Sequence, residues 1–172
     1  VVDRILFERK NNNILPRQSN LFTTNYDLFI EHAAAKSASL ILNDGFARTP
    51  GEISNFHFAP ERYADRTYRG GTVYSHPAEV PTINLVKLHG SLSWRRKDGD
   101  IAYDASKISS LKEEERTDPV AVRGYLERFF LVLPNLRKFH STMMDRFYYD
   151  LLRMFANSLE KENALLVCFG FS

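Results

Sequence analysis

A histidine stands where a short apolar run ends in a glycine turn. Residues 84–88 (NLVKL) have the composition of a buried strand, and His89 and Gly90 follow directly. In open α/β sheets ligands bind at the carboxyl ends of the strands, and an imidazole can exchange a proton near neutral pH. His89 is therefore a candidate general base, or a group that orients a sugar hydroxyl. A turn histidine bonded to a backbone carbonyl is the alternative.

An earlier segment ends in the same way. A short strand over residues 21–24 leads into Asn25 and Asp27, just before a helix. Two polar strand ends at one sheet edge predict a single cleft built from both, beside a helix N-terminus that suits an anion. More ordinary roles stay open, because Asn25 is a common helix cap and Asp27 can form a capping box with Thr24.

The chain offers a third strand end after the apolar residues 164–169. Gly170 would let a ligand approach the backbone closely, and Ser172 could bond a ribose or a phosphate. An ordinary turn is the alternative, and without further context it is the better one.

The other reactive side chains indicate structure rather than chemistry. Cys168 lies in the apolar run and is expected to be a buried, inert thiol. As the only cysteine, it excludes a disulfide framework and a multi-cysteine zinc site. Ser91 and Ser93 follow His89 too closely for a hydrolase triad. The remaining histidines show no metal-ligand spacing and are expected to be structural or solvated: His32, His57, His76 and His140.

Size and charge limit the class of protein. With 172 residues, 44% of them hydrophobic, the chain suits one globular domain. Its 23 basic and 21 acidic residues leave a net charge of +2, too little to indicate nucleic-acid binding. No apolar run is long enough to span a membrane and no signal peptide is visible, so we expect a cytoplasmic protein. Because Val1 is not an initiator Met and the end adjoins a strand, we expect an excerpt truncated at both ends.

The order of strands and helices predicts an α/β fold with a mostly parallel sheet and helices on both faces. Helical periodicity favours helices over residues 1–10, 26–42 and 139–159. Apolar runs favour strands over residues 83–88 and 129–133, besides the two already named.

The remaining segments are expected to be turns and exposed chain. Residues 94–96 and 101–103 flank an Asp-Gly pair, which favours a β-hairpin. Residues 44–81 lack a steady period and are predicted to form a long loop, and loops of that length are usually functional or mobile. Residues 107–123 are charged and predicted to be exposed and partly helical.

Three motifs in this order resemble the landmarks of Sir2-like domains, most closely the branch found in bacterial anti-phage defence proteins. They are residues 23–27 (TTNYD), 87–94 (KLHGSLSW) and 165–172 (LLVCFGFS). Residues 44–46 and 134–155 are similar to that branch as well. The resemblance implies a Rossmann-like fold, a single domain over residues 1–172 and an enzyme that consumes NAD.

The resemblance also implies roles for single residues. Asn25 and His89 would be catalytic, with Asp27 near the nicotinamide ribose. The other residues implied to bind NAD line the same pocket or touch its adenosine side: Thr23, Thr24, Gly170 and Ser172.

Two features of the family are missing from the sequence. A glycine-rich loop of Gly-Ala-Gly type is absent, and we expect it upstream of Val1. The four-cysteine zinc module is also absent, with the hairpin near Trp94 in its place, so we expect neither zinc nor protein deacylation. The resemblance thus implies an NAD+ hydrolase that releases ADP-ribose and nicotinamide and acts in anti-phage defence by depleting NAD+.

Two other functions stay open. One is a catalytically silent module that senses NAD or ADP-ribose. The other is a module that assembles with a defence partner, such as a helicase-like ATPase, an Argonaute or a phage protein, with residues 46–74 as interface or lid. We expect a homo-oligomer and no membrane association.

Overall fold

The computed structural model describes residues 15–48, 50–51, 56–70, 77–97, 99–104, 111–132 and 146–170. The chain divides into two compact units, Val1–Leu131 and Val132–Ser172. A single domain over the whole chain stays a prediction. The helix expected over residues 1–10 lies outside the described residues.

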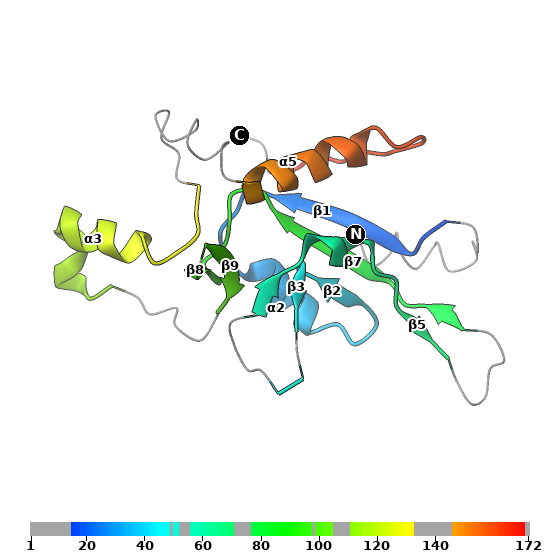
Figure 1. Cartoon of the computed structure of the whole chain (residues 1–172), viewed down its shortest axis with the longest axis horizontal. Helices are drawn as coiled ribbons and strands as arrows, with labels where there is room; N and C mark the ends of the chain where they lie inside the picture. Colours follow the sequence, from blue (N-terminus) through cyan, green and yellow to red (C-terminus); the bar gives the residue numbers. More distant parts are fainter. Residues whose placement is uncertain are drawn as a thin grey trace. The chain divides into compact units, whose positions relative to one another are not determined.

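The first unit contains a three-stranded parallel sheet. Its strands are β1 (Gln18–Thr23), β7 (Thr82–Lys87) and β2 (Ile41–Asn43), in the order β1-β7-β2 (Figure 1). All six residues of the central strand β7 are buried, the polar Thr82, Asn84 and Lys87 included, as expected for a strand covered on both faces. The strands predicted over residues 21–24 and 83–88 are confirmed, and so is the α/β class.

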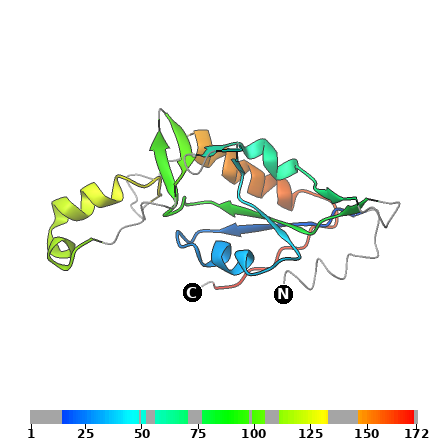
Figure 2. The ribbon, with the colours of Figure 1, turned by 90° about the horizontal axis from the view of Figure 1, so that it is seen from below.

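Short helices cover both faces of this parallel sheet. Helix α2 (Phe29–Ala35) lies on one face and the 3-10 helix η2 (Pro60–Ala64) on the other (Figure 2). The helix predicted over residues 26–42 was wrong beyond Ala35. Ser37 and Ser39 hydrogen-bond to each other at 3.1 Å and favour a turn, after which the chain returns to the sheet as β2.

A second, antiparallel sheet has the strand order β3-β4-β9-β8. Its strands are β3 (Phe46–Ala47), β4 (Phe56–Phe58), β9 (Asp100–Tyr103) and β8 (Trp94–Lys97). Strands β8 and β9 are the predicted hairpin, and Gly99 in its turn has a φ of 83°, which glycine adopts readily.

The segment predicted as one long loop is more ordered than expected. Besides β3, β4 and η2, residues 44–81 contain the antiparallel pair β5 (Tyr68–Arg69) and β6 (Ala78–Glu79). The long-loop prediction was therefore wrong in the described part of this segment. Strands of two or three residues are too short to leave a periodic signal in the sequence.

Aromatic rings form the core between the strands of the antiparallel sheet. The ring of Phe46 contacts those of Phe58 and Trp94 at centroid distances of 5.3 and 5.7 Å. All three residues are buried. Edge-to-face contacts of this kind stabilise a core beyond the area that they bury.

The strand predicted over residues 129–133 was wrong for its described part. Only Leu131 forms an isolated bridge, with Gly90. The two phenylalanines before it pack instead against the hairpin, where Arg95 lies 4.1 Å from the ring centroid of Phe129 and Arg96 lies 4.8 Å from that of Phe130. Aromatic residues favour strands, but here stacked guanidinium groups bury them.

The charged segment predicted over residues 107–123 is exposed and partly helical in its described part, which begins at residue 111. It contains the 3-10 helix η3 (Glu113–Thr117) and helix α3 (Pro119–Leu126). Asp118 caps α3 by accepting a hydrogen bond from the Val120 backbone N–H at 2.9 Å.

The described part of the second unit contains helix α5 (Arg146–Leu159), which confirms that portion of the predicted helix. Residues 164–169 form no strand there and are exposed, and Cys168 is an exposed thiol. The predicted final strand and its buried cysteine were therefore wrong. An apolar run can become a strand only where a neighbouring strand satisfies its backbone groups, and the described residues provide none.

Candidate functional site

The strands β1 and β7 end level with each other. Thr23 pairs with Lys87, and the Leu88 N–H continues the ladder with a 2.9 Å bond to the Thr23 carbonyl. The chain then leaves the sheet in two neighbouring segments, the Asn25 loop (residues 24–28) and the His89 loop (residues 88–93). The Leu92 N–H donates to the Tyr26 carbonyl at 3.0 Å, so the two loops contact directly.

His89 is half-buried beside the ring of Tyr26. The two ring centroids are 6.4 Å apart, with the planes tilted by 35°. Burial lowers the pKa of His89 from its ordinary value of 6.5, which favours the neutral imidazole at neutral pH. Neither ring nitrogen hydrogen-bonds to any described residue, so the alternative of a turn histidine held by a carbonyl finds no support there. Gly90, at a φ of 86°, forms the turn behind the ring.

Asn25 lies at the exposed tip of the neighbouring loop. Its backbone N–H donates to the Thr23 Oγ1 at 3.1 Å, which turns the chain away from β1. Within the described part of the chain, nothing hydrogen-bonds its side-chain amide. Thr24 beside it is exposed as well. The loop thus presents an amide that can both donate and accept a hydrogen bond.

Asp27 has a structural role in this loop. Its Oδ1 accepts a hydrogen bond from the Phe29 backbone N–H at 3.0 Å, at the start of α2. The ordinary reading of Asp27 as a group that helps to begin the helix is thus supported, although Thr24 does not share in it as a capping box would require.

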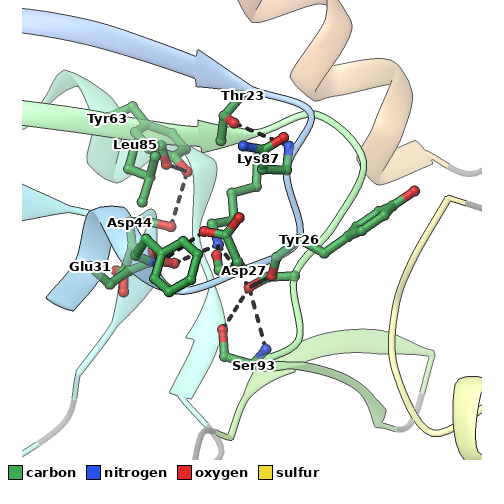
Figure 3. Close-up of polar contacts among 12 residues, drawn as sticks. Thr23, Tyr26, Asp27, Glu31, Asp44, Tyr63, Leu85, Lys87 and Ser93 are labelled. Carbon is green, nitrogen blue, oxygen red and sulfur yellow. Dashed lines mark hydrogen bonds and ion pairs between the residues drawn. The ribbon is translucent and has the colours of Figure 1, made fainter. Parts of the chain in front are cut away.

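Sequence reasoning missed a buried ion pair beneath the two loops. Lys87 Nζ lies 2.7 Å from Glu31 Oε1, and the two side chains are only 3% and 15% exposed. Nζ also donates to the Asp27 carbonyl and, at 3.2 Å, to Ser91 Oγ. Figure 3 shows the lysine running from β7 toward Asp27 and Glu31, with the Tyr26 ring pointing away from them. A lysine inside an apolar strand was the signal that could have predicted it.

A narrow recess adjoins this ion pair. It is lined by residues of both sheets, of α2 and of two connecting segments: Glu31, Asp44, Leu85, Lys87, Ser93, Trp94 and Tyr103. The Tyr63 hydroxyl lies 3.0 Å from the carbonyl oxygens of two of these residues, Asp44 and Leu85, and shares its one hydrogen between them (Figure 3). Of its polar side chains, Lys87 bonds to both loops, whereas Asp44 pairs with Arg48.

A comparison with protein families matches residues 19–172 to the SIR2-like domain. The chain belongs to the SIR2-like domain family. The match includes both strand ends, and it confirms the resemblance to Sir2-like domains and the Rossmann-like α/β fold. A search of curated proteins found no match. SIR2-like domains bind NAD, so membership is compatible with an NAD-dependent enzyme.

The strand ends of this SIR2-like domain carry side chains whose chemistry suits hydrogen bonds to NAD. The exposed amide of Asn25 and the half-buried imidazole of His89 both offer hydrogen-bonding atoms that no described residue uses. Such groups suit ribose hydroxyls and a carboxamide. The sequence contains no Gly-Ala-Gly loop.

The last two predicted residues, Gly170 and Ser172, lie outside the first unit. Gly170 belongs to the second unit, where its φ is 70°. Ser172 lies outside the described residues. Their contact with the adenosine side of NAD stays a prediction.

Among the described residues of the SIR2-like domain, no group of three or more His, Cys, Asp or Glu side chains is arranged to hold a metal ion. None of the described helices has the length and apolar character needed to cross a membrane.

Proposed function

We propose that this SIR2-like domain hydrolyses NAD+ to ADP-ribose and nicotinamide, with Asn25 and His89 as its catalytic residues. The contact between the Asn25 loop and the His89 loop carries the proposal, since Tyr26 lies against the His89 ring and bonds to Leu92. Both catalytic candidates therefore stand at one sheet edge, where ligands of open α/β sheets bind.

The reaction breaks the bond between C1′ of the ribose and the nicotinamide nitrogen. The electron pair of that bond leaves with nicotinamide, whose positive charge is thereby neutralised, and a water oxygen bonds to C1′. His89, kept neutral by burial, accepts a proton from that water or from a ribose hydroxyl. Asn25 holds the water or the nicotinamide-side ribose by hydrogen bonds. Removal of one such interaction typically lowers a rate by about 100-fold.

The remaining predicted contacts complete the proposed substrate site. Thr23, Thr24 and Asp27 would border the nicotinamide end, because they share the Asn25 loop or its base. Gly170 and Ser172 would contact the adenosine side. These assignments rest on the resemblance of the three motifs to the family.

In the cell, the proposed activity would deplete NAD+ in defence against phage. This role rests on the similarity of the motifs to the defence branch of the family. For this role we expect the protein to be cytoplasmic and to form a homo-oligomer, with or without a defence partner. A plaque assay with and without His89→Ala tests it, because loss of protection only in the variant would tie defence to the site.

The proposed activity is tested by nicotinamide release from NAD+, measured with the intact protein and its Asn25→Ala variant. We expect release by the wild type and a loss of about 100-fold in the variant. Calorimetry with NAD+ distinguishes the hydrolase from the main alternative, a catalytically silent sensor. Binding of NAD+ without nicotinamide release would identify a sensor and contradict the hydrolase.

A further inference from the structure

The buried lysine at the end of β7 uses every hydrogen of its ammonium group. An ammonium has three donors, and Lys87 Nζ contacts three acceptors, namely Glu31 Oε1, the Asp27 carbonyl and Ser91 Oγ. These acceptors belong to three different segments: helix α2, the Asn25 loop and the His89 loop. One side chain of the central strand therefore ties together the parts that surround the proposed site (Figure 3).

A buried charge at this position is costly unless it is paired. The other residues of β7 near this end, Leu85 and Val86, are apolar and fully buried, and an apolar residue at position 87 would satisfy the same core. Glu31 depends on the lysine in return, because its Oε2 is buried without a hydrogen bond to any described residue. An ion pair that an apolar pair could replace is weak evidence for a role in stability alone.

The serines of the His89 loop extend this network. Ser91 and Ser93 are both buried, and their hydroxyl oxygens lie 3.0 Å apart. The Ser93 N–H also donates to Ser91 Oγ at 3.3 Å. The contact of Lys87 with Ser91 therefore reaches the turn on the far side of His89 and fixes the course of the loop.

We propose that Lys87, paired with Glu31, is a positioning residue that holds the Asn25 loop against the His89 loop in the catalytic arrangement. The inference rests on the proposed hydrolase function and adds a residue to it that touches no substrate. Because a misplacement of about 1 Å can lower a rate by about 100-fold, loss of this tie should act on the chemical step.

The test separates position from stability by removing both charges at once. The double variant Lys87→Met/Glu31→Leu leaves no unpaired charge, so its melting temperature should stay near that of the wild type. Its kcat for nicotinamide release should fall by about 10- to 100-fold, with a smaller change in KM. If that double variant does not fold, Lys87→Met/Glu31→Gln, which also leaves no unpaired charge and keeps the shape of the Glu31 side chain, takes its place with the same readouts.

A matched control comes from the other face of β7. Asn84 is buried like Lys87, but its side chain bonds to Asn20, Asn43 and the Tyr63 carbonyl, away from both loops. Asn84→Ala should lower the melting temperature and leave kcat unchanged. An equal fall of kcat in this control would mean that the loss of any buried polar side chain disables the enzyme. That result would overturn the positioning role of Lys87.

Hydrogen exchange of residues 88–93 gives a readout that needs no activity. The Leu92 N–H bonds to the Tyr26 carbonyl across the two loops, so exchange in this peptide should accelerate in the double variant and not in Asn84→Ala. Wild-type kcat and wild-type exchange in the double variant would overturn the inference. If the wild type itself releases no nicotinamide, the proposed function fails, and the exchange result alone decides whether Lys87 holds the loops together.

Discussion

The rings of Tyr26 and His89 lie with their centroids 6.4 Å apart, although 63 positions separate the two residues in the sequence. The contact exists because β1 and β7 are parallel neighbours that end at the same level. It joins the two segments that carry the amide and the imidazole of the proposed site.

The pH dependence of the activity should reflect a histidine with a lowered pKa. Burial favours the neutral form of His89, which is the form that can accept a proton. As the pH falls through this lowered pKa, kcat/KM should fall about tenfold per pH unit, with a midpoint below 6.5. The pKa of the Tyr26 hydroxyl is raised by burial, so this neighbour stays protonated in that range.

A pH profile of nicotinamide release from about pH 4.5 to about pH 8, which spans the range in which histidine titrates, checks this expectation. A midpoint above 6.5, or an unchanged acidic limb in the residual activity of His89→Gln, would assign the titration to another group.

Asn25 and Asp27 should respond differently to replacement by alanine. Asn25 is exposed and its amide hydrogen-bonds to no described residue, so Asn25→Ala should leave the unfolding free energy within about 0.5 kcal/mol of wild type. Asp27→Ala removes the hydrogen bond at the start of α2 and should cost about 1 kcal/mol. Urea unfolding measures both, and equal losses would show that Asn25 also supports the fold.

Gly45→Ala should destabilise the first unit strongly. Gly45 has a φ of 79°, and an added Cβ would lie 2.6 Å from the Tyr63 ring, whose hydroxyl holds Asp44 and Leu85. Strain and overpacking together should cost about 2 to 4 kcal/mol. Gly51→Ala is the matched control, because its φ is also positive, at 91°, but open space surrounds the added atom. Similar losses of unfolding free energy in both variants would show that the Tyr63 ring moves aside without an energetic cost.

Cys168 should react with a maleimide in the native protein. The thiol is exposed in the structure, whereas the sequence predicted a buried one. Mass spectrometry should show complete labelling of the wild type without denaturant. The Cys168→Ser variant should remain unlabelled, since the chain has no other cysteine. If the thiol reacted only after denaturant was added, Cys168 would be buried, as the sequence predicted.

The strands that carry the site were predictable because their sequences are simple. Residues 83–88 form an apolar run that ends in a turn, and this pattern locates β7 to within one residue. The end of α2 was not predictable in the same way, since the apolar periodicity continues past Ala35 into residues that form β2. Whether Ile41 continues a helix or starts a strand depends on the pairing with β7, which is a tertiary contact.

The polar support of the site was harder to predict than its exposed residues. His89 and Asn25 stand next to strand ends, where local sequence indicates chemistry. The partnership of Lys87 with Glu31 links residues 56 positions apart and depends on how α2 lies on the sheet. No local pattern encodes that placement, so the sequence shows a charged residue in a strand without showing its partner.

Nicotinamide release from NAD+ by the intact protein, compared between wild type and His89→Ala, tests the central claim most directly. The wild type should release nicotinamide and ADP-ribose in equal amounts, and the variant should be slower by about 100-fold or more while melting at the same temperature. Equal rates in the two folded proteins would contradict the assignment of His89 and of the shared strand-end site.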